Sequence, residues 1–263
     1  MWPFSKDYSQ YGSPTVPSDL IRYVCGTESM DEFLRSGYEV ASMLNLAAKN
    51  YSGRYLSEFE RVLDFGCGCG RLIRFLGPAS KLFGCDVNRA VIEFCKVNYP
   101  AANFYQNDYL PPLIYRDGLF DLIYSFSVFS HLSQDIEAIW LEELVRIGRP
   151  GCLYLITVQG DWMIEATLGD EAVIAKQSGF YFKLVHQRHN TESDFPDYYE
   201  ASYHTSEYIA SHWSRYFDIV CVIRGDRPER YVPRDLLIEH GNPSLRPMGQ
   251  DLVVAIRRGK GGL

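Results

Sequence analysis

The sequence predicts an α/β protein built on a doubly wound, mostly parallel sheet. Three observations support this class. Between residues 61 and 158, short apolar runs of strand length alternate with helical segments. A glycine-rich turn, GCGCG at residues 66–70, follows the first apolar run, and acidic or amide residues close the next two. A chain of 263 residues with 46% hydrophobic residues can bury the core of one such domain.

The chain before the sheet is predicted to form an arm and a helical cap. Residues 1–19 are rich in Pro, Ser, Tyr and Gly, which favours irregular structure. Apolar residues recur at helical spacing across residues 29–50, which indicates one or two helices with a break near Gly37. We interpret residues 1–60 as this arm and cap.

Strands and helices then follow in turn through residues 61–158, the predicted core. The predicted strands cover residues 61–66, 81–87, 103–108, 120–127 and 152–158, and the predicted helices cover 71–77, 88–100 and 133–148. Asn88 is placed to cap the second helix and Pro100 to end it. Arg71 and Arg74 are interpreted as part of a solvated helix face.

Residues 159–204 interrupt this alternation and are predicted to form an insertion. They contain eleven aromatic or histidine residues, more than a solvated loop needs. Because loops at the carboxyl ends of strands carry function, we expect a lid over the binding site, with Trp162 and Tyr203 as ring contacts. Residues 205–263 then give a helix at 205–216 and strands at 217–225 and 250–259, which complete the core.

The glycine-rich turn does not fit the common phosphate motifs. The dinucleotide pattern GxGxxG needs a third glycine where Arg71 stands, and the phosphate-loop ending Gly-Lys-Ser/Thr is absent. Cys67 and Cys69 could form half of a metal site, but no second Cys/His pair has ligand spacing, so no metal is expected. The turn still lets backbone approach a ligand closely.

Polar residues at the strand ends indicate what this ligand is. Asp64 stands two residues before Gly66, and a carboxylate there suits an ammonium group. Asp86 closes the next strand, where an acid accepts hydrogen bonds from ribose hydroxyls. Asn107 and Asp108 close the third strand and can meet an adenine amino group. An amino-acid end, a ribose and an adenine together describe S-adenosylmethionine.

These residues lie in motifs that resemble a known family. VLDFGCGCGR, GCDV, NDYLPPL and FDLIYSFSVFSHL look like the successive motifs of class I S-adenosylmethionine-dependent methyltransferases, in the small-molecule methyltransferase domain group. The resemblance covers residues 60–160 well and the last helix and strands more loosely. It implies a Rossmann-like sheet of seven strands, with the last one inserted antiparallel beside the fifth.

The resemblance also implies a role for each motif residue. Asp64 would stand near the methionine amino group. Asp86 would bind both ribose hydroxyls, with Val87 packed on the adenine. The loop under the methionine and ribose would be formed by Gly66, Cys67, Gly68 and Gly70.

The later motifs would complete the cofactor site and begin the substrate site. Asn107 and Asp108 would meet the adenine edge. Ser125 and Phe126 would line the end of the fourth strand near the transferable methyl group. Ser127 would face the substrate.

The general base is the least defined role. His131 follows the fourth strand, and a histidine there could deprotonate a hydroxyl or an amine. Alternatively, His131 has a structural role at the start of the next helix, where it forms a hydrogen bond to the backbone. His186, His189 and His204 lie in or beside the insertion, and any of them could be the base or a surface residue.

The predicted function is methylation of a small molecule on oxygen or nitrogen, with a sugar or another metabolite as the acceptor. A net charge of −7 and a pI near 5.4 argue against a nucleic-acid partner. No run approaches the roughly 18 apolar residues of a membrane span, and nothing argues for export, so a cytoplasmic protein with reduced thiols is expected. The alternatives are a protein or peptide methyltransferase and a non-catalytic module that binds S-adenosylmethionine.

Overall fold

The computed structural model describes residues 11–76, 81–183, 200–226 and 249–259. Its main sheet has seven strands in the order β3-β2-β1-β4-β5-β9-β8, and a second sheet pairs β6 with β7. The α/β class and the antiparallel position of the last strand beside the fifth are confirmed. The chain divides into two compact units, the first with described residues up to 109 and 120–124, and the second with the rest.

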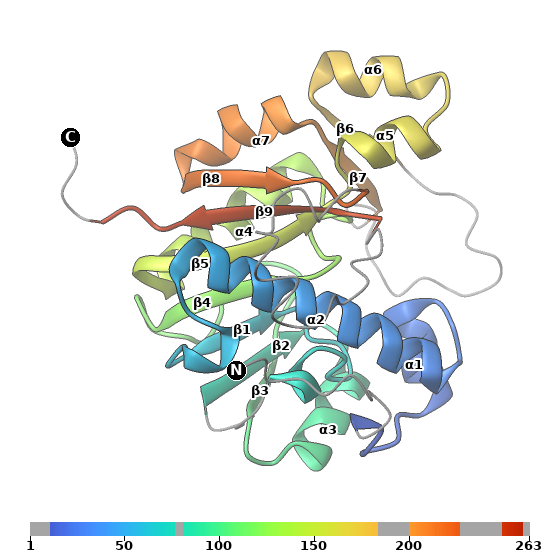
Figure 1. Ribbon diagram of the computed structural model, residues 1–263, viewed down its shortest axis with the longest axis vertical. Helices are drawn as coiled ribbons and strands as arrows, with labels where there is room; N and C mark the ends of the chain where they lie inside the picture. The colour runs from blue at the N-terminus through green and yellow to red at the C-terminus, as the bar shows by residue number, and fades with distance from the viewer. Residues whose placement is uncertain (1–10, 77–80, 184–199, 227–248, 260–263) are drawn as a thin grey trace. The chain divides into compact units, whose positions relative to one another are not determined.

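The first unit contains the parallel part of the sheet (Figure 1). Strand β1 (Val62–Phe65) pairs in parallel with β2 (Leu82–Asp86) and with β4 (Phe120–Ser125), and β3 (Asn103–Gln106) pairs in parallel with β2. Every residue of β1 and β4 is buried, as expected for parallel strands that are covered on both faces.

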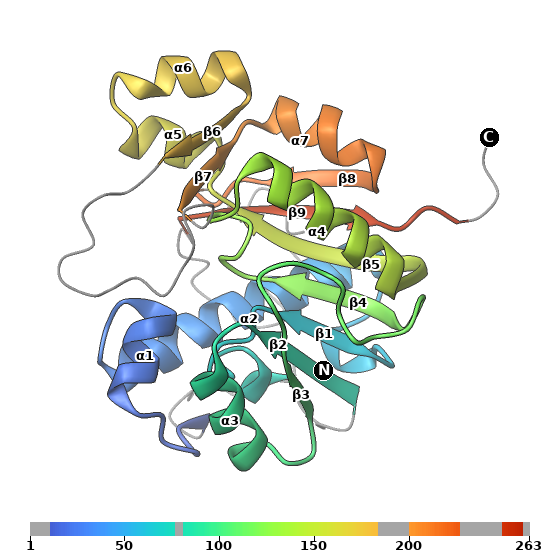
Figure 2. The ribbon, with the colours of Figure 1, turned by 180° about the vertical axis from the view of Figure 1, so that it is seen from behind.

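Two helices precede these strands. They are α1 (Ser18–Cys25), which the sequence did not predict, and α2 (Met30–Ser52). Helix α2 crosses in front of the strands of this unit in Figure 1 and lies behind them in Figure 2. The expected break at Gly37 is wrong, because α2 is continuous. A Cβ on Gly37 would lie 2.7 Å from the Arg71 carbonyl oxygen, so this glycine permits close packing.

The helix expected at residues 71–77 is also wrong. The chain there makes only the 3-10 turn η3 (Ile73–Phe75), and the amides of Phe75 and Leu76 bond three residues back. Gly77 and Pro78 follow at once, which leaves no length for an α-helix. The other predicted helix of this region is confirmed as α3 (Arg89–Asn98), capped by Asn88.

Between α2 and β1 the chain makes a further short turn, η2 (Leu56–Glu58). The second unit contains α4 (Gln134–Ile147) and β5 (Gly148–Val158), with α4 lying across β5 in Figure 2. After the insertion come α7 (Ser206–His212), η5 (Trp213–Arg215), β8 (Asp218–Ile223) and β9 (Asp251–Ile256). Strand β9 is antiparallel to both β5 and β8.

The predicted insertion has secondary structure of its own, visible as a group around α5 and α6 in Figure 1. It forms α5 (Asp161–Thr167), α6 (Glu171–Ser178), β6 (Phe180–Lys183) and β7 (Ala201–His204). These elements share a small apolar core of Ile164, Leu168, Ala175 and Tyr203. Residues 184–199, with His186 and His189, lie outside the described residues. The four-part division of the chain stays a prediction.

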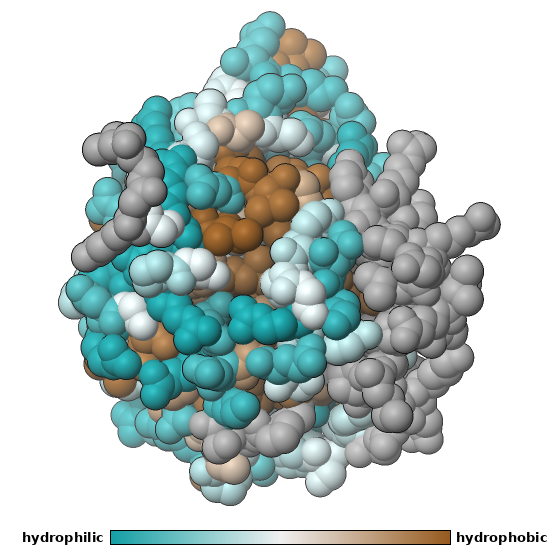
Figure 3. All heavy atoms as spheres, turned by 60° about the vertical axis from the view of Figure 1, so that its left-hand side comes forward, coloured by the Kyte–Doolittle hydropathy of each residue, from teal (hydrophilic) through white to brown (hydrophobic). Residues whose placement is uncertain are grey.

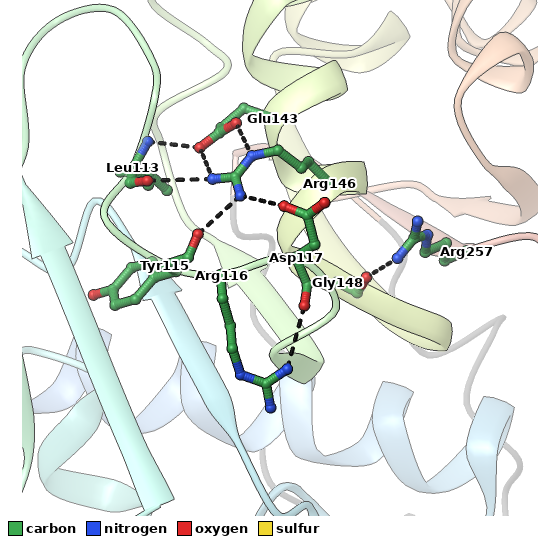
Figure 4. A network of polar contacts seen from close by, with 8 residues as sticks. All are labelled: Leu113, Tyr115, Arg116, Asp117, Glu143, Arg146, Gly148 and Arg257. Atoms are coloured by element: carbon green, nitrogen blue, oxygen red, sulfur yellow. Dashed lines mark hydrogen bonds and ion pairs between the residues drawn. The ribbon is translucent and has the colours of Figure 1, made fainter.

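One arginine holds the loop before β4 onto helix α4 (Figure 4). Arg146 donates to both oxygens of Glu143 at 2.7 Å and to Asp117 at 2.7 Å. It also donates to the carbonyls of Tyr115 and Leu113 at 2.9 and 3.2 Å. Glu143 in turn accepts the Leu113 amide at 2.6 Å. The nearly buried Glu143 carboxylate is thus neutralised by a guanidinium whose other donors fix the loop.

The surface is mostly hydrophilic on the side shown in Figure 3, where apolar residues gather in one area. Within the part of the chain that the structure describes, no helix combines the length and apolar character that a membrane span needs.

We expect Arg146→Leu to lower the free energy of unfolding by about 2–3 kcal/mol, because it leaves the Glu143 carboxylate without its cation in a nearly buried place. Urea denaturation measures this loss. Lys176→Leu is the matched control, since it removes an ion pair to Glu165 that is about half exposed on both sides and should change little. Equal losses in the two variants would contradict the structural role of Arg146.

Candidate active site

The glycine loop is tied to the end of β2 by its backbone. The amides of Gly66 and Cys67 both donate to the Cys85 carbonyl, at 2.9 and 3.0 Å. Gly68 and Gly70 have φ of 51° and 79°, the left-handed region that disfavours other residues. A Cβ on Gly68 would lie 2.6 Å from the Val24 side chain, so only glycine fits beneath helix α1.

Asp86 joins three segments at the end of β2. Its two carboxylate oxygens accept the amides of Gly68 and Asn88, both at 2.9 Å. Burial raises the pKa of Asp86 to about 6, and the backbone hydrogen bonds limit the rise. An ionised Asp86 keeps further acceptor capacity for ligand hydroxyls. Val87 follows it, half-buried.

Asp64 is a buried carboxyl group with one unsatisfied oxygen. It is 2% exposed, and its Oδ2 has no hydrogen-bond partner among the described residues. Burial raises the pKa of Asp64 to about 7, with a smaller contribution from the nearby Asp86 charge, while the neighbouring Tyr124 hydroxyl opposes the rise. A desolvated carboxyl of this kind favours a positively charged ligand group.

The end of β3 adds a second unsatisfied acceptor. The Asn107 amide donates to the Asp86 carbonyl at 3.1 Å, so this residue is held beside the end of β2. The buried Oδ1 of Asn107 has no partner in the described part of the chain, which suits a ligand N–H group. Asp108 is exposed. The first unit thus brings together the predicted residues from Asp64 to Asp108.

Ser125, Phe126 and Ser127 belong to the second unit. Ser125 is buried, whereas Phe126 and Ser127 are half-buried. Ser127 has φ of 63°, a left-handed conformation that costs a non-glycine residue about 1 kcal/mol or more. Its amide donates to Thr157 Oγ1 at 2.9 Å and its hydroxyl accepts from Gln250 at 2.9 Å. The sequence predictions missed Thr157 and Gln250.

The other predicted residues of the second unit have structural contacts. His131 Nδ1 lies 3.1 Å from the Glu200 carbonyl oxygen, and His204 is buried against Glu137 at 2.5 Å. Tyr203 is 8% exposed in the core of the insertion, and Trp162 is half-buried on α5. The roles of His131 as base and of Trp162 and Tyr203 as substrate contacts stay predictions.

Comparison with known proteins identifies the region that carries these features. Residues 62–151 match a family model described as a methyltransferase domain. This region is therefore similar to a methyltransferase domain. At the level of fold it is similar to an S-adenosylmethionine-dependent methyltransferase from Mesorhizobium loti (18% identity, TM-score 0.50, covering 75% of this chain and 90% of that one). It is also similar to a Pyrococcus horikoshii protein (15% identity, TM-score 0.52, covering 82% and 88%).

A curated relative matches about half of this chain. The chain is 32% identical over 127 residues to a tRNA (carboxymethyluridine(34)-5-O)-methyltransferase of Arabidopsis thaliana. The match covers 48% of this chain and 29% of that protein, so the chain spans less than a third of the relative's length.

The residues of the region that matches the methyltransferase model fit S-adenosylmethionine. The unpartnered Asp64 oxygen suits the ammonium group, and the unpartnered Asn107 oxygen suits an amino group of the adenine. Asp86 can accept further hydrogen bonds from a ligand, and the glycine loop lets its backbone lie close to that ligand. Among the described residues, no cluster of His, Cys, Asp or Glu could hold a metal ion.

The cysteines of the glycine loop are structural. Burial raises the pKa of the Cys67 thiol well above its usual value, which disfavours a nucleophilic thiolate. The thiols of Cys67 and Cys95 both donate to the Gly68 carbonyl, at 3.5 and 3.4 Å. They help to fix the loop conformation.

The N-terminal arm packs directly on the glycine loop, which the sequence did not predict. Arg71 donates to the Cys25 thiol at 3.3 Å, and Arg74 donates to the Tyr11 carbonyl at 2.8 Å and to the Tyr99 hydroxyl at 2.6 Å. The interpretation of both arginines as a solvated face is therefore wrong. No local signal could have shown it, because these partners lie far apart in the sequence.

We expect the affinity for S-adenosylhomocysteine to fall about ten-fold between pH 8 and pH 6, because Asp64, with its pKa of about 7, must lose its proton to bind an ammonium group. Calorimetry at each pH measures this. Asp64→Asn should bind more weakly at pH 8 and show only the smaller slope of Asp86. An unchanged slope in Asp64→Asn would contradict the role of Asp64.

The same variant should stabilise the ligand-free protein at pH 8. The pKa of Asp64 rises from 3.8 to about 7 on folding, so the folded state binds more protons between these values, and ionisation lowers the free energy of unfolding as pH rises. Asp64→Asn should recover about 2–4 kcal/mol at pH 8 and almost nothing at pH 4, measured by urea denaturation. The exposed Asp170→Asn is the control, and an equal gain there would refute the assignment.

Proposed function

We propose that this protein is an S-adenosylmethionine-dependent methyltransferase that acts on a small molecule. The observation that carries the proposal is the buried carboxyl of Asp64 with its unsatisfied Oδ2, which lies in the region that matches the methyltransferase model. A protein without a cationic ligand gains nothing from a carboxyl group in this place, because burial alone destabilises its charged form.

The residues of the first unit would hold the cofactor in three places. Asp64 binds the ammonium group, Asp86 accepts from the ribose hydroxyls, and Asn107 accepts from the adenine amino group. When bound, S-adenosylmethionine supplies a methyl group on a positively charged sulfur. The protein's part in the reaction is to bring the acceptor atom into line with that methyl group.

The charge of the chain supports a small acceptor. A net charge of −7 repels the phosphates of a nucleic acid unless a local basic face compensates. The half-buried Phe126, Ser127 and Trp162 give the second unit a mixture of apolar and polar groups of the kind that lines small-molecule sites.

A second candidate is methylation of transfer RNA. It is favoured by one observation, the partial match to a tRNA methyltransferase over 127 residues. The relative's substrate is a modified uridine, so the reacting group is itself a small polar unit on a large molecule.

Transfer of a labelled methyl group distinguishes these functions. The protein is incubated with S-adenosylmethionine tritiated in the methyl group and with a cell extract separated into a small-molecule filtrate, transfer RNA and protein. We expect label in a compound of the filtrate. We expect no label with Asp86→Ala, because this variant loses the carboxylate that accepts one amide of the glycine loop and one amide before α3, and that would accept the ribose hydroxyls. Calorimetry with S-adenosylhomocysteine should show at least a ten-fold loss of affinity for the same variant.

The other outcomes reassign the function. Label in transfer RNA alone supports the second candidate, and label in protein alone supports a protein or peptide methyltransferase. Tight binding of S-adenosylhomocysteine with no label in any fraction supports a non-catalytic binding module.

A further inference from the structure

Tyr124 is a buried tyrosine of the first unit whose hydroxyl has no hydrogen-bond partner among the described residues. It lies on β4 and is 0% exposed. Other buried tyrosines bond their hydroxyls, since Tyr154 donates to a carbonyl at 3.1 Å and Tyr208 to a carboxylate at 3.0 Å. An unsatisfied buried hydroxyl opposes folding, whereas a phenylalanine ring would fill the same place without that cost. The hydroxyl at position 124 therefore points to a role other than packing.

The nearest strand places a second unsatisfied atom beside this hydroxyl. Strands β1 and β4 are neighbours in the sheet (Figure 1), and their register pairs Asp64 with Tyr124. Paired residues of parallel strands project from the same face of the sheet. Asp64 Oδ2 is also buried and has no hydrogen-bond partner in the described part of the chain. Neighbours on one face thus offer a hydroxyl that can donate and an oxygen that can accept.

The two side chains already influence each other's charge. Burial raises the pKa of Asp64 to about 7, and the Tyr124 hydroxyl is the strongest influence that opposes this rise. Burial, with a further contribution from Asp64, raises the pKa of Tyr124 well above its usual value. The tyrosine therefore keeps its proton throughout the pH range in which Asp64 titrates, and it stays a donor there.

The other titratable groups near Asp64 do not supply an equal donor. The charge of Asp86 adds to the rise in the pKa of Asp64, and Arg71 opposes that rise less than the tyrosine hydroxyl does. Cys67 and Cys85 also lie within electrostatic reach of the carboxyl group. Burial raises the pKa of both thiols well above its usual value, so they add no charge. The tyrosine is thus the main group that favours an ionised carboxylate at this place.

We propose that Tyr124 is a positioning residue for cofactor binding, whose hydroxyl donates to the ionised Asp64 carboxylate and holds it toward the ammonium group of the cofactor. This inference rests on the proposed function, in which Asp64 binds that ammonium group. Hydrogen bonds to charged groups are stronger than those between neutral groups, so the hydroxyl favours the form of Asp64 that binds a cation. Such bonds are often long in a free site and tighten around the ligand, so we expect this contact to shorten on binding.

Removal of the hydroxyl tests the role through the pH dependence of binding. Tyr124→Phe keeps the ring, but without its donor Asp64 ionises at a higher pH, so fewer molecules carry the carboxylate near neutral pH. Calorimetry with S-adenosylhomocysteine should show a loss of affinity that grows from no more than about three-fold at pH 8.5 to about ten-fold at pH 6. Equal losses at the two pH values, or no loss at either, would overturn the role of Tyr124.

Tyr154→Phe is the matched control. It also removes the hydroxyl of a fully buried tyrosine on the main sheet, but this hydroxyl donates to the Leu144 carbonyl in the second unit. We expect its affinity for S-adenosylhomocysteine to follow that of the wild type at both pH values. A steeper pH dependence in this variant too would show that the effect of Tyr124→Phe does not come from Asp64.

A double variant tests whether Tyr124 acts through Asp64. When Asp64→Asn is combined with Tyr124→Phe, no carboxylate is left to position, so the tyrosine substitution should change affinity by no more than about two-fold at either pH. A pH-dependent further loss in the double variant would overturn the proposal.

Asp64→Asn alone separates this inference from the proposed function on which it rests. Wild-type affinity of Asp64→Asn for S-adenosylhomocysteine at pH 8.5 would refute the cofactor role of Asp64 and both proposals with it. Weak binding by Asp64→Asn, together with a wild-type pH profile in Tyr124→Phe, would refute the positioning role alone and leave the proposed function standing.

Discussion

The carboxylate of Asp86 is the interaction on which the cofactor half of the protein depends. Each of its oxygens accepts a backbone amide from a different segment, Gly68 in the glycine loop and Asn88 at the start of α3. Since the Asp86 carbonyl also accepts the Asn107 amide, one residue fixes the ends of β2 and β3 and the loop after β1. Asp86 thus holds the glycine loop, the start of α3 and Asn107 in fixed positions relative to one another.

This arrangement places two carboxyl groups in a poorly solvated region. Asp64 and Asp86 are both nearly buried, and the charge of Asp86 adds to the rise in the pKa of Asp64. Asp86 is compensated by backbone amides, whereas at Asp64 only the Tyr124 hydroxyl and the Arg71 charge oppose the rise, and Oδ2 has no hydrogen-bond partner among the described residues. Asp86 thus organises the loop, whereas Asp64 keeps an oxygen that can accept a hydrogen bond from a ligand.

The sequence predicted those features that are encoded locally. The cap at Asn88, the succession of strands along the chain and the position of Asp64 before the glycines each depend on residues a few positions apart. The features that sequence reasoning missed depend on contacts between distant segments. Gly37 was interpreted as a helix breaker because nothing nearby shows that the Arg71 carbonyl lies against it, and Gln250 belongs to no motif although it contacts Ser127.

The contact between Val24 and Gly68 places helix α1 against the glycine loop. The stretch that matches the methyltransferase model begins at residue 62, yet helix α1 covers its glycine loop, in which the Cys69 thiol donates to the Leu20 carbonyl. Arg71 and Arg74, just after the loop, donate to Cys25 and Tyr11. A boundary drawn by sequence similarity therefore cuts through a packed interface. Excised at that boundary, the core would expose the apolar side of its own binding loop. The segment that matches the family model is therefore shorter than the segment that packs together in the fold.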